Sequence, residues 1–249
     1  MTVIPSEVEE SLTISETSRD VSTSVNMTKR LFVSLRVYHD IPSRSAALNM
    51  AIDEALVENA TEPLIRFYKW NHPALSFGYF GKFADVGDHA PQRELVRRWT
   101  GGGIVLHGSD LTYSIVIPAT EPAFSESAMS IYEKIHNALR AALVANGQRA
   151  ELAASGVSKI SDSCFANPGR ADVMLNGHKV AGAAQRRIRR GLLQQGSVQD
   201  VDLGGDFEKS FASQLSDNCL EQTIDNQTLF RAQEIADQKY ATPGWLRRR

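Results

Sequence analysis

Two stretches of the chain carry apolar residues at the spacing of an amphipathic helix. The first is residues 43–60 (SRSAALNMAIDEALVENA), where Ser43 or Ser45 can serve as the N-cap. The apolar face of this predicted helix consists of Leu48, Ile52, Ala55 and Leu56. We interpret Asn49, Asp53 and Glu54 as the solvated polar face of a core helix, without a direct catalytic role.

The second predicted helix covers residues 125–147 (SESAMSIYEKIHNALRAALVANG) and ends at Asn146-Gly147. Its apolar stripe consists of Met129, Ile131, Ile135, Leu139 and Leu143. This stripe predicts that the helix packs on a sheet. Residues 200–215 are typical of a loop and a short helix, and Leu229 to Tyr240 predicts a helix closed by Pro243-Gly244.

Strands are predicted where β-favouring runs alternate with turn signals. The runs are residues 31–40, 63–70, 74–80, 111–118 and the two halves of 171–184. Asn71-His72-Pro73 separates the second run from the third. A helix-like stretch begins at Phe80 to Lys82, and Asn176-Gly177 predicts a two-residue turn between antiparallel strands.

Length and composition favour a globular protein with one good-sized core, because 42% of the 249 residues are hydrophobic. The formal net charge of −2 provides no overall positive field that would gather nucleic acid or an anionic membrane. A local cluster, Arg186-Arg187 and Arg189-Arg190, lacks interleaved aromatic residues, so we interpret it as a hairpin tip that contacts an acidic protein partner.

The first 26 residues contain no aromatic residue and no apolar period, which predicts a disordered tail. We place the tail at residues 1–30 and a single domain at 31–249. Two cysteines, Cys164 and Cys219, are too few for a disulfide framework, and no signal or membrane-spanning run is visible. These observations predict a cytoplasmic protein with free thiols. Because no heptad stands out, we expect a monomer.

Candidate chemistry centres on Cys164 and Lys179. Lys179 follows the Asn176-Gly177 turn and precedes a run of small residues, 180–184, so its ammonium is predicted to face a narrow apolar channel where it can hold a carboxylate or an acyl carbonyl. The alternative is a solvated lysine at a strand end. Cys164 lies in a polar, loop-like context that favours a reactive thiol over a small buried hydrophobic residue.

A second candidate segment, VRRWTGGGIVLHGSDLTYSIVIP, contains three consecutive glycines after two arginines. Glycines let a ligand approach the backbone, and their N–H groups can face an anion. The spacing fits neither a P-loop nor a dinucleotide fingerprint. His107 in this segment is either a base or a hydrogen-bonded structural histidine.

The order of these residues resembles that of the lipoate–protein ligase and octanoyltransferase family, which is related in fold to biotin–protein ligases. Cys164, Pro168, Asp172, Gly177, Lys179, Gly182, Ala184, Gln185, Arg187 and Gly196 fall in the order of the family pattern "CF..P....D....G.K..G.AQ.R......HG". One departure is Gln195, where members usually have His. "RR.(T/S)GGG.V.H" resembles the ligand-binding loop of the lipoate ligases, and the resemblance extends from about Leu31 to the C-terminus.

The resemblance implies an α+β domain around a mainly antiparallel central sheet, flanked by helices, that transfers a medium-chain acyl group to a lysine of a lipoyl-carrier domain. Two mechanisms are implied. In a cysteine-dependent octanoyltransferase, Cys164 takes the acyl group from octanoyl-acyl carrier protein while Lys179 polarises the carbonyl. In a ligase, ATP and Mg²⁺ activate free lipoate or octanoate. The LTYS strand favours the octanoyltransferase mechanism, and the triple glycine favours the ligase mechanism.

The implied site comprises catalytic Cys164 and Lys179, with substrate-binding Arg97, Arg98, Gly101, Gly102, Gly103, His107, Gly182 and Ala184. No metal ligands are expected, and no cofactor is expected for an octanoyltransferase. The implied partners are lipoyl-domain proteins (the glycine cleavage H protein and the E2 subunits of 2-oxoacid dehydrogenases) and acyl carrier protein as donor. A non-catalytic adaptor that binds lipoyl domains is a third possibility.

Overall fold

The computed structural model describes residues 30–154 and 168–248. The tail predicted before residue 30 and the predicted nucleophile Cys164 lie outside the described residues. Within them, strands form an eight-stranded sheet and a three-stranded sheet. In spatial order the large sheet contains β11 (Cys219–Gln222), β1 (Leu35–Arg44), β2 (Leu64–Trp70), β6 (Leu111–Pro118), β10 (Gly191–Val198), β9 (His178–Ile188), β8 (Val173–Leu175) and β7 (Ala150–Leu152).

The large sheet is mixed, with most of its strand pairs antiparallel. Strand β1 is parallel to both β2 and β11, whereas the pairs from β2 through to β7 are antiparallel. The small sheet has the order β4 (Glu94–Arg97), β3 (Ala74–Phe77) and β5 (Ile104–His107). The predicted α+β fold with a mainly antiparallel central sheet is confirmed.

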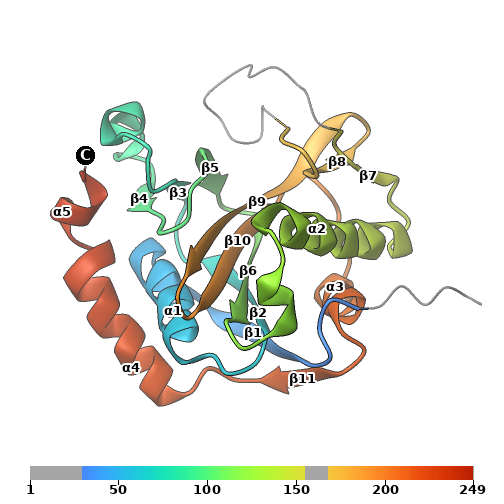
Figure 1. Cartoon of the computed structure of the whole chain (residues 1–249). Helices are drawn as coiled ribbons and strands as arrows, with labels where there is room; N and C mark the ends of the chain where they lie inside the picture. Colours follow the sequence, from blue (N-terminus) through green and yellow to red (C-terminus); the bar gives the residue numbers. More distant parts are fainter. Residues whose placement is uncertain (1–29, 155–167, 249) are drawn as a thin grey trace, which may run out of the picture.

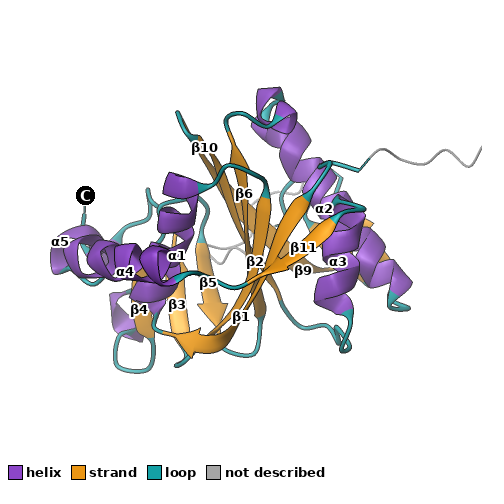
Figure 2. Cartoon of the chain, turned by 90° about the horizontal axis from the view of Figure 1, so that it is seen from below, coloured by secondary structure: helices purple, strands orange, loops and turns teal. Residues whose placement is uncertain are grey.

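Helices cover both faces of the large sheet (Figure 1, Figure 2). On one face lie α2 (Ala128–Ala145) and α3 (Phe207–Leu215), and on the other α1 (Ala46–Asn59) and α4 (Asn226–Ile235). A hydrophobic cluster fills each interface. The central strands β6 and β10 are therefore buried along their whole length.

Both long helices form where the sequence predicts them. Ser45 caps α1 by accepting from the backbone N–H of Leu48, and Ser127 caps α2 by accepting from Ser130. The predicted stretch after Phe80 is two short 3-10 helices, Phe83–Asp85 and Gly87–His89.

The prediction of a solvated polar face on α1 is wrong. Asn49 and Asp53 are fully buried, because the side chain of Arg66 on β2 projects beneath the helix. Its guanidinium donates to Asp53 Oδ1 at 2.8 Å, to Asn49 Oδ1 at 2.7 Å and to Asp40 Oδ2 at 2.7 Å. Burial would lower the pKa of Arg66, but the neighbouring carboxylates raise it above its ordinary value.

The C-terminal prediction needs one correction. Helix α4 continues through a π-helical turn to Tyr240, but Pro243-Gly244 opens a further short helix, α5 (Pro243–Leu246). Proline fits there because the first turn of a helix does not use its missing N–H, and Thr242 supplies the cap.

We predict that Arg66→Met destabilises the fold by about 3–5 kcal/mol, because it leaves the buried carboxylate of Asp53 without its cation, whereas Asp40 keeps Arg44. Urea denaturation measures the change. The matched control is Arg36→Met, which breaks a half-exposed ion pair with Glu62 in the connection before β2 and costs at most about 1 kcal/mol. Equal losses in the two variants would contradict this account of Arg66.

Candidate functional site

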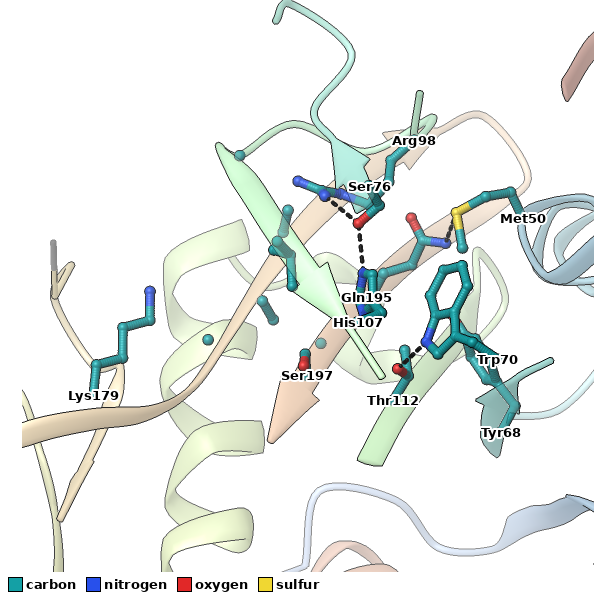
Figure 3. A pocket seen from close by; sticks show the side chains of 16 residues that line it. Met50, Tyr68, Trp70, Ser76, Arg98, His107, Thr112, Lys179, Gln195 and Ser197 are labelled. Atoms are coloured by element: carbon teal, nitrogen blue, oxygen red, sulfur yellow. Dashed lines mark hydrogen bonds between the residues drawn. The ribbon is translucent and has the colours of Figure 1, made fainter. Parts of the chain in front are cut away.

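A pocket of about 440 Å³, partly open to solvent, lies between the small sheet and the α1 face of the large sheet. Figure 3 shows Lys179 at one end of it and Met50, Tyr68 and Trp70 at the other. The lining residues are Met50, Tyr68, Trp70, Ser76, Arg98, Gly102, Val105, His107, Thr112, Lys179, Gly182, Ala183, Ala184, Gln195, Gly196 and Ser197.

Lys179 reaches the pocket from the start of β9. Asn176 and Gly177 have positive φ angles of 50° and 79°, as the predicted two-residue hairpin turn requires. Lys179 is only 9% exposed, and its Nζ lies 2.8 Å from Asp172 Oδ2. Lys179 is buried, as predicted, which excludes the solvated strand-end alternative, but its ammonium faces the carboxylate of Asp172 rather than an apolar channel.

The carboxylate of Asp172 is held from two sides. The backbone N–H of Gly169 donates to Oδ2 at 2.6 Å, and the hydroxyl of Tyr132 on α2 donates to Oδ1. The same hydroxyl accepts from the backbone N–H of Ala183 at 3.1 Å. The ammonium of Lys179 therefore faces a carboxylate whose position is fixed by both α2 and β9.

Gly182 is required by the path of the lysine. A Cβ at this position would lie 2.5 Å from Lys179 Cε and 2.6 Å from its Nζ. The small-residue run that follows Lys179 in the sequence thus has a definite use, because it leaves room for the lysine side chain to lie flat over the strand.

Arg98 binds the glycine loop to the pocket wall. Its guanidinium donates to the carbonyl oxygens of Gly101 and Gly103 at 3.0 and 2.7 Å, and to Ser76 Oγ at 2.7 Å. The loop thus presents carbonyl groups to Arg98. Gly102 has a φ of 85°, which suits glycine, and lines the pocket.

His107 lies in a fully hydrogen-bonded position against this wall. Its Nδ1 is 2.8 Å from Asp110 Oδ2 and its Nε2 is 2.7 Å from Ser76 Oγ, while its ring stacks on Trp70 at 4.1 Å. Burial lowers the pKa of His107, so the neutral ring is favoured. With Nδ1–H donating to Asp110, Nε2 accepts from the hydroxyl of Ser76, which is the arrangement of a structural histidine.

Gln195, the departure from the family pattern, forms part of the pocket floor. Its amide donates to Asp53 Oδ2 at 2.7 Å, and its carbonyl oxygen accepts from Thr100 Oγ1 at 2.8 Å. The side chain therefore connects helix α1 to the glycine loop.

The structure brings most of the predicted site residues together and places one elsewhere. Lys179, Arg98, Gly102, His107, Gly182 and Ala184 line the pocket, with Gly101 and Gly103 flanking Gly102. Arg97 instead donates to five backbone carbonyl oxygens, three of them in residues 245–248, and does not line the pocket.

Arg97 and Arg98 differ because successive side chains of a strand point to opposite faces. Sequence reasoning assigned no role to Tyr132, Ser76 or Gln195. Their contacts depend on folding, and no sequence signal marks Tyr132 or Ser76, whereas Gln195 stood out only as the departure from the family pattern. Asp172 stood in the family pattern without an assigned role.

No group of three or more His, Cys, Asp or Glu side chains in residues 30–154 and 168–248 is arranged to hold a metal ion. In the same ranges, no helix combines the length and apolar character needed to cross a bilayer.

Residues 45–223 match the family model of the lipoyl protein ligase A/B catalytic domain. The chain is 35% identical to the octanoyltransferase LipM of Oceanobacillus iheyensis, over 79% of this chain and 77% of the relative. It is 30% identical to LipM of Brevibacillus brevis, over 82% of this chain and 96% of the relative. The fold is similar to protein Ta0514, a putative lipoate protein ligase from T. acidophilum, with a TM-score of 0.69 at 22% identity, over 86% and 98% of the two chains.

The buried histidine behind the lysine site gives a prediction for pH. Burial lowers the pKa of His136 on α2 to about 4, against about 6.5 when unfolded. Between these values the unfolded chain binds the extra proton, so stability falls as pH decreases from 6.5 towards 4, by about 1.4 kcal/mol per pH unit from this residue.

Denaturation of His136→Gln at several pH values tests this, because the free energy of unfolding of the variant should change less steeply with pH. The control is His72→Gln in an exposed turn, which keeps the original pH profile. An unchanged slope in His136→Gln would show that other groups cause the pH dependence.

Proposed function

Because the chain belongs to the lipoyl protein ligase A/B catalytic domain family, we propose that it transfers an octanoyl group from acyl carrier protein to a specific lysine of lipoyl-carrier domains. The observation that carries the proposal is the buried Lys179 at one end of a narrow pocket, in a chain whose curated relatives are octanoyltransferases. The lining at the opposite end, Met50, Tyr68 and Trp70, suits a medium acyl chain.

The proposed reaction has two acyl transfers. The thiolate of Cys164 attacks the thioester carbonyl of octanoyl-acyl carrier protein, the bond from this carbon to the carrier's sulfur breaks, and the carrier leaves as a thiolate that takes a proton from water. The amine of the acceptor lysine then attacks the acyl-enzyme, the cysteine sulfur leaves, and the nitrogen loses its proton as the amide forms. The ammonium of Lys179 donates to the acyl oxygen and stabilises the negative charge that develops on it in both steps.

The proposed partners follow from this reaction. The acceptors are lipoyl-domain proteins, namely the glycine cleavage H protein or the E2 subunits of 2-oxoacid dehydrogenases, and acyl carrier protein is the donor. The arginines at the β9–β10 turn suit an acidic partner. The ligase alternative rests on the triple glycine loop, and it requires ATP and Mg²⁺, whereas the proposed reaction requires neither.

The donor is tested with purified protein, octanoyl-acyl carrier protein and an apo lipoyl domain. We expect acyl transfer without ATP and, when the acceptor is left out, an octanoyl thioester adduct in the intact mass. Cys164→Ala loses both, and Cys219→Ala, which removes the other cysteine, keeps both. Transfer from free lipoate only with ATP and Mg²⁺, with Cys164→Ala fully active, would establish the ligase instead.

Gly182→Ala is predicted to lower the transfer rate on the order of 10²-fold, because its Cβ displaces the Lys179 ammonium by about 1 Å or more. The matched control is Gly205→Ala, where an added Cβ meets no atom within 4 Å. Rates and melting temperatures are compared for both variants. A stable Gly182→Ala enzyme with the original rate would remove the lysine position from the mechanism.

A further inference from the structure

A lysine in an acyl-transfer site presents a chemical problem. The reaction proposed above uses the neutral amine of an acceptor lysine to attack an activated acyl group. Lys179 carries an amine of the same kind into the same pocket. If its nitrogen were neutral, it would compete with the acceptor, and the product would be an octanoyl amide on the enzyme itself.

We propose that Asp172, held by Tyr132, protects Lys179 from acylation by keeping its side chain as the ammonium ion. An ammonium has no lone pair and therefore cannot attack a carbonyl, but it still donates hydrogen bonds to one. This inference rests on the proposed function for the position of the acyl carbonyl near Lys179.

The first argument is burial. An ammonium removed from water favours its neutral form unless an opposite charge compensates it. The side chains of Lys179 and Asp172 are 4% and 5% exposed, and Nζ and Oδ2 are 2.8 Å apart. The carboxylate therefore supplies, at contact distance, the negative charge that favours the protonated lysine.

The second argument is the arrangement around the carboxylate. A carboxylate that accepts several hydrogen bonds stays ionised. Asp172 accepts from the Gly169 N–H and the Tyr132 hydroxyl in addition to Lys179. The Tyr132 hydroxyl remains a donor, because burial and the nearby carboxylate raise its pKa. Because these two donors are neutral and stabilise the carboxylate, the proton between Lys179 and Asp172 stays on the lysine nitrogen.

The third argument is the neighbouring histidine. His136 packs against Tyr132 with ring centroids 4.0 Å apart, and its Nδ1–H donates to the Ala171 carbonyl. Burial keeps this ring neutral above about pH 4. Tyr132 and His136 of α2 therefore add no charge beside the ion pair of Lys179 and Asp172.

The protected reaction is simple to write. The neutral Nζ attacks the carbonyl carbon of an octanoyl thioester, a C–N bond forms, the C–S bond breaks, and the thiolate leaves and takes a proton from the nitrogen. The amide resists hydroxylamine, whereas thioesters are cleaved by it. Hydroxylamine followed by peptide mass spectrometry therefore distinguishes self-acylation from an acyl-enzyme intermediate.

The experiment incubates the full-length enzyme with octanoyl-coenzyme A, treats it with hydroxylamine, and measures octanoyl amide on Lys179. We expect little amide in the unmodified sequence and at least about tenfold more in Asp172→Asn, since a hydrogen bond to a charged group contributes about that factor. Tyr132→Phe, which keeps the ion pair, should give an intermediate amount and serves if Asp172→Asn does not fold.

The matched control is Glu126→Gln, which removes the carboxylate 2.5 Å from Lys134 in an exposed pair. Water solvates that ammonium, so the acylation of Lys134 should not change. No increase in amide on Lys179 in folded Asp172→Asn and Tyr132→Phe, or equal amide in the unmodified sequence, would overturn the inference. Transfer to an apo lipoyl domain is measured separately, so failure of the proposed function is seen independently.

Discussion

The buried guanidinium of Arg66 is the constraint on which the shape of the pocket depends. It donates to Asp40 on β1 and to Asp53 on α1. The carboxylate of Asp53 also accepts from Ser114 on β6 and Gln195 on β10. Each of these buried groups would lose a hydrogen bond if it left its partner. Arg66 and Asp53 together therefore fix helix α1 against β1, β2, β6 and β10.

Gln195 extends this constraint to the glycine loop through Thr100. A histidine at this position could also donate once and accept once, but its hydrogen bonding would change when it gained a proton. The side-chain amide of glutamine does not titrate. At every pH its NH₂ group therefore donates to Asp53 and its carbonyl oxygen accepts from Thr100. In this chain the connection from Arg66 and Asp53 to the glycine loop therefore does not depend on the protonation state of residue 195.

Short sequence patterns correctly predicted the structural features that depend on interactions between residues close together in the chain. The capped helix at residues 46–59, the Asn176-Gly177 turn and the burial of Lys179 follow from residues close together in the chain, and the fold class followed from the family resemblance. The burial of Asp53 did not, since its partners Arg66 and Gln195 lie 13 and 142 residues away. An acidic residue on a helix is normally solvated, and only a buried cation on another element reverses that expectation.

The two adjacent arginines show why motif matching placed a structural residue in the binding site. Both belong to the pattern around the triple glycine, but Arg97 ends β4 and is directed to the C-terminal segment, whereas Arg98 directly follows the strand and is directed to the opposite side, into the pocket. Arg97 does not line the pocket, and its N–H groups donate to carbonyl oxygens, including that of Arg248. Trp245 completes the contact by donating from its indole nitrogen to the Arg97 carbonyl. The C-terminal segment therefore packs against the strand that precedes the glycine loop. The sequence motif includes Arg98, which contacts the loop, and Arg97, which contacts the C-terminal segment.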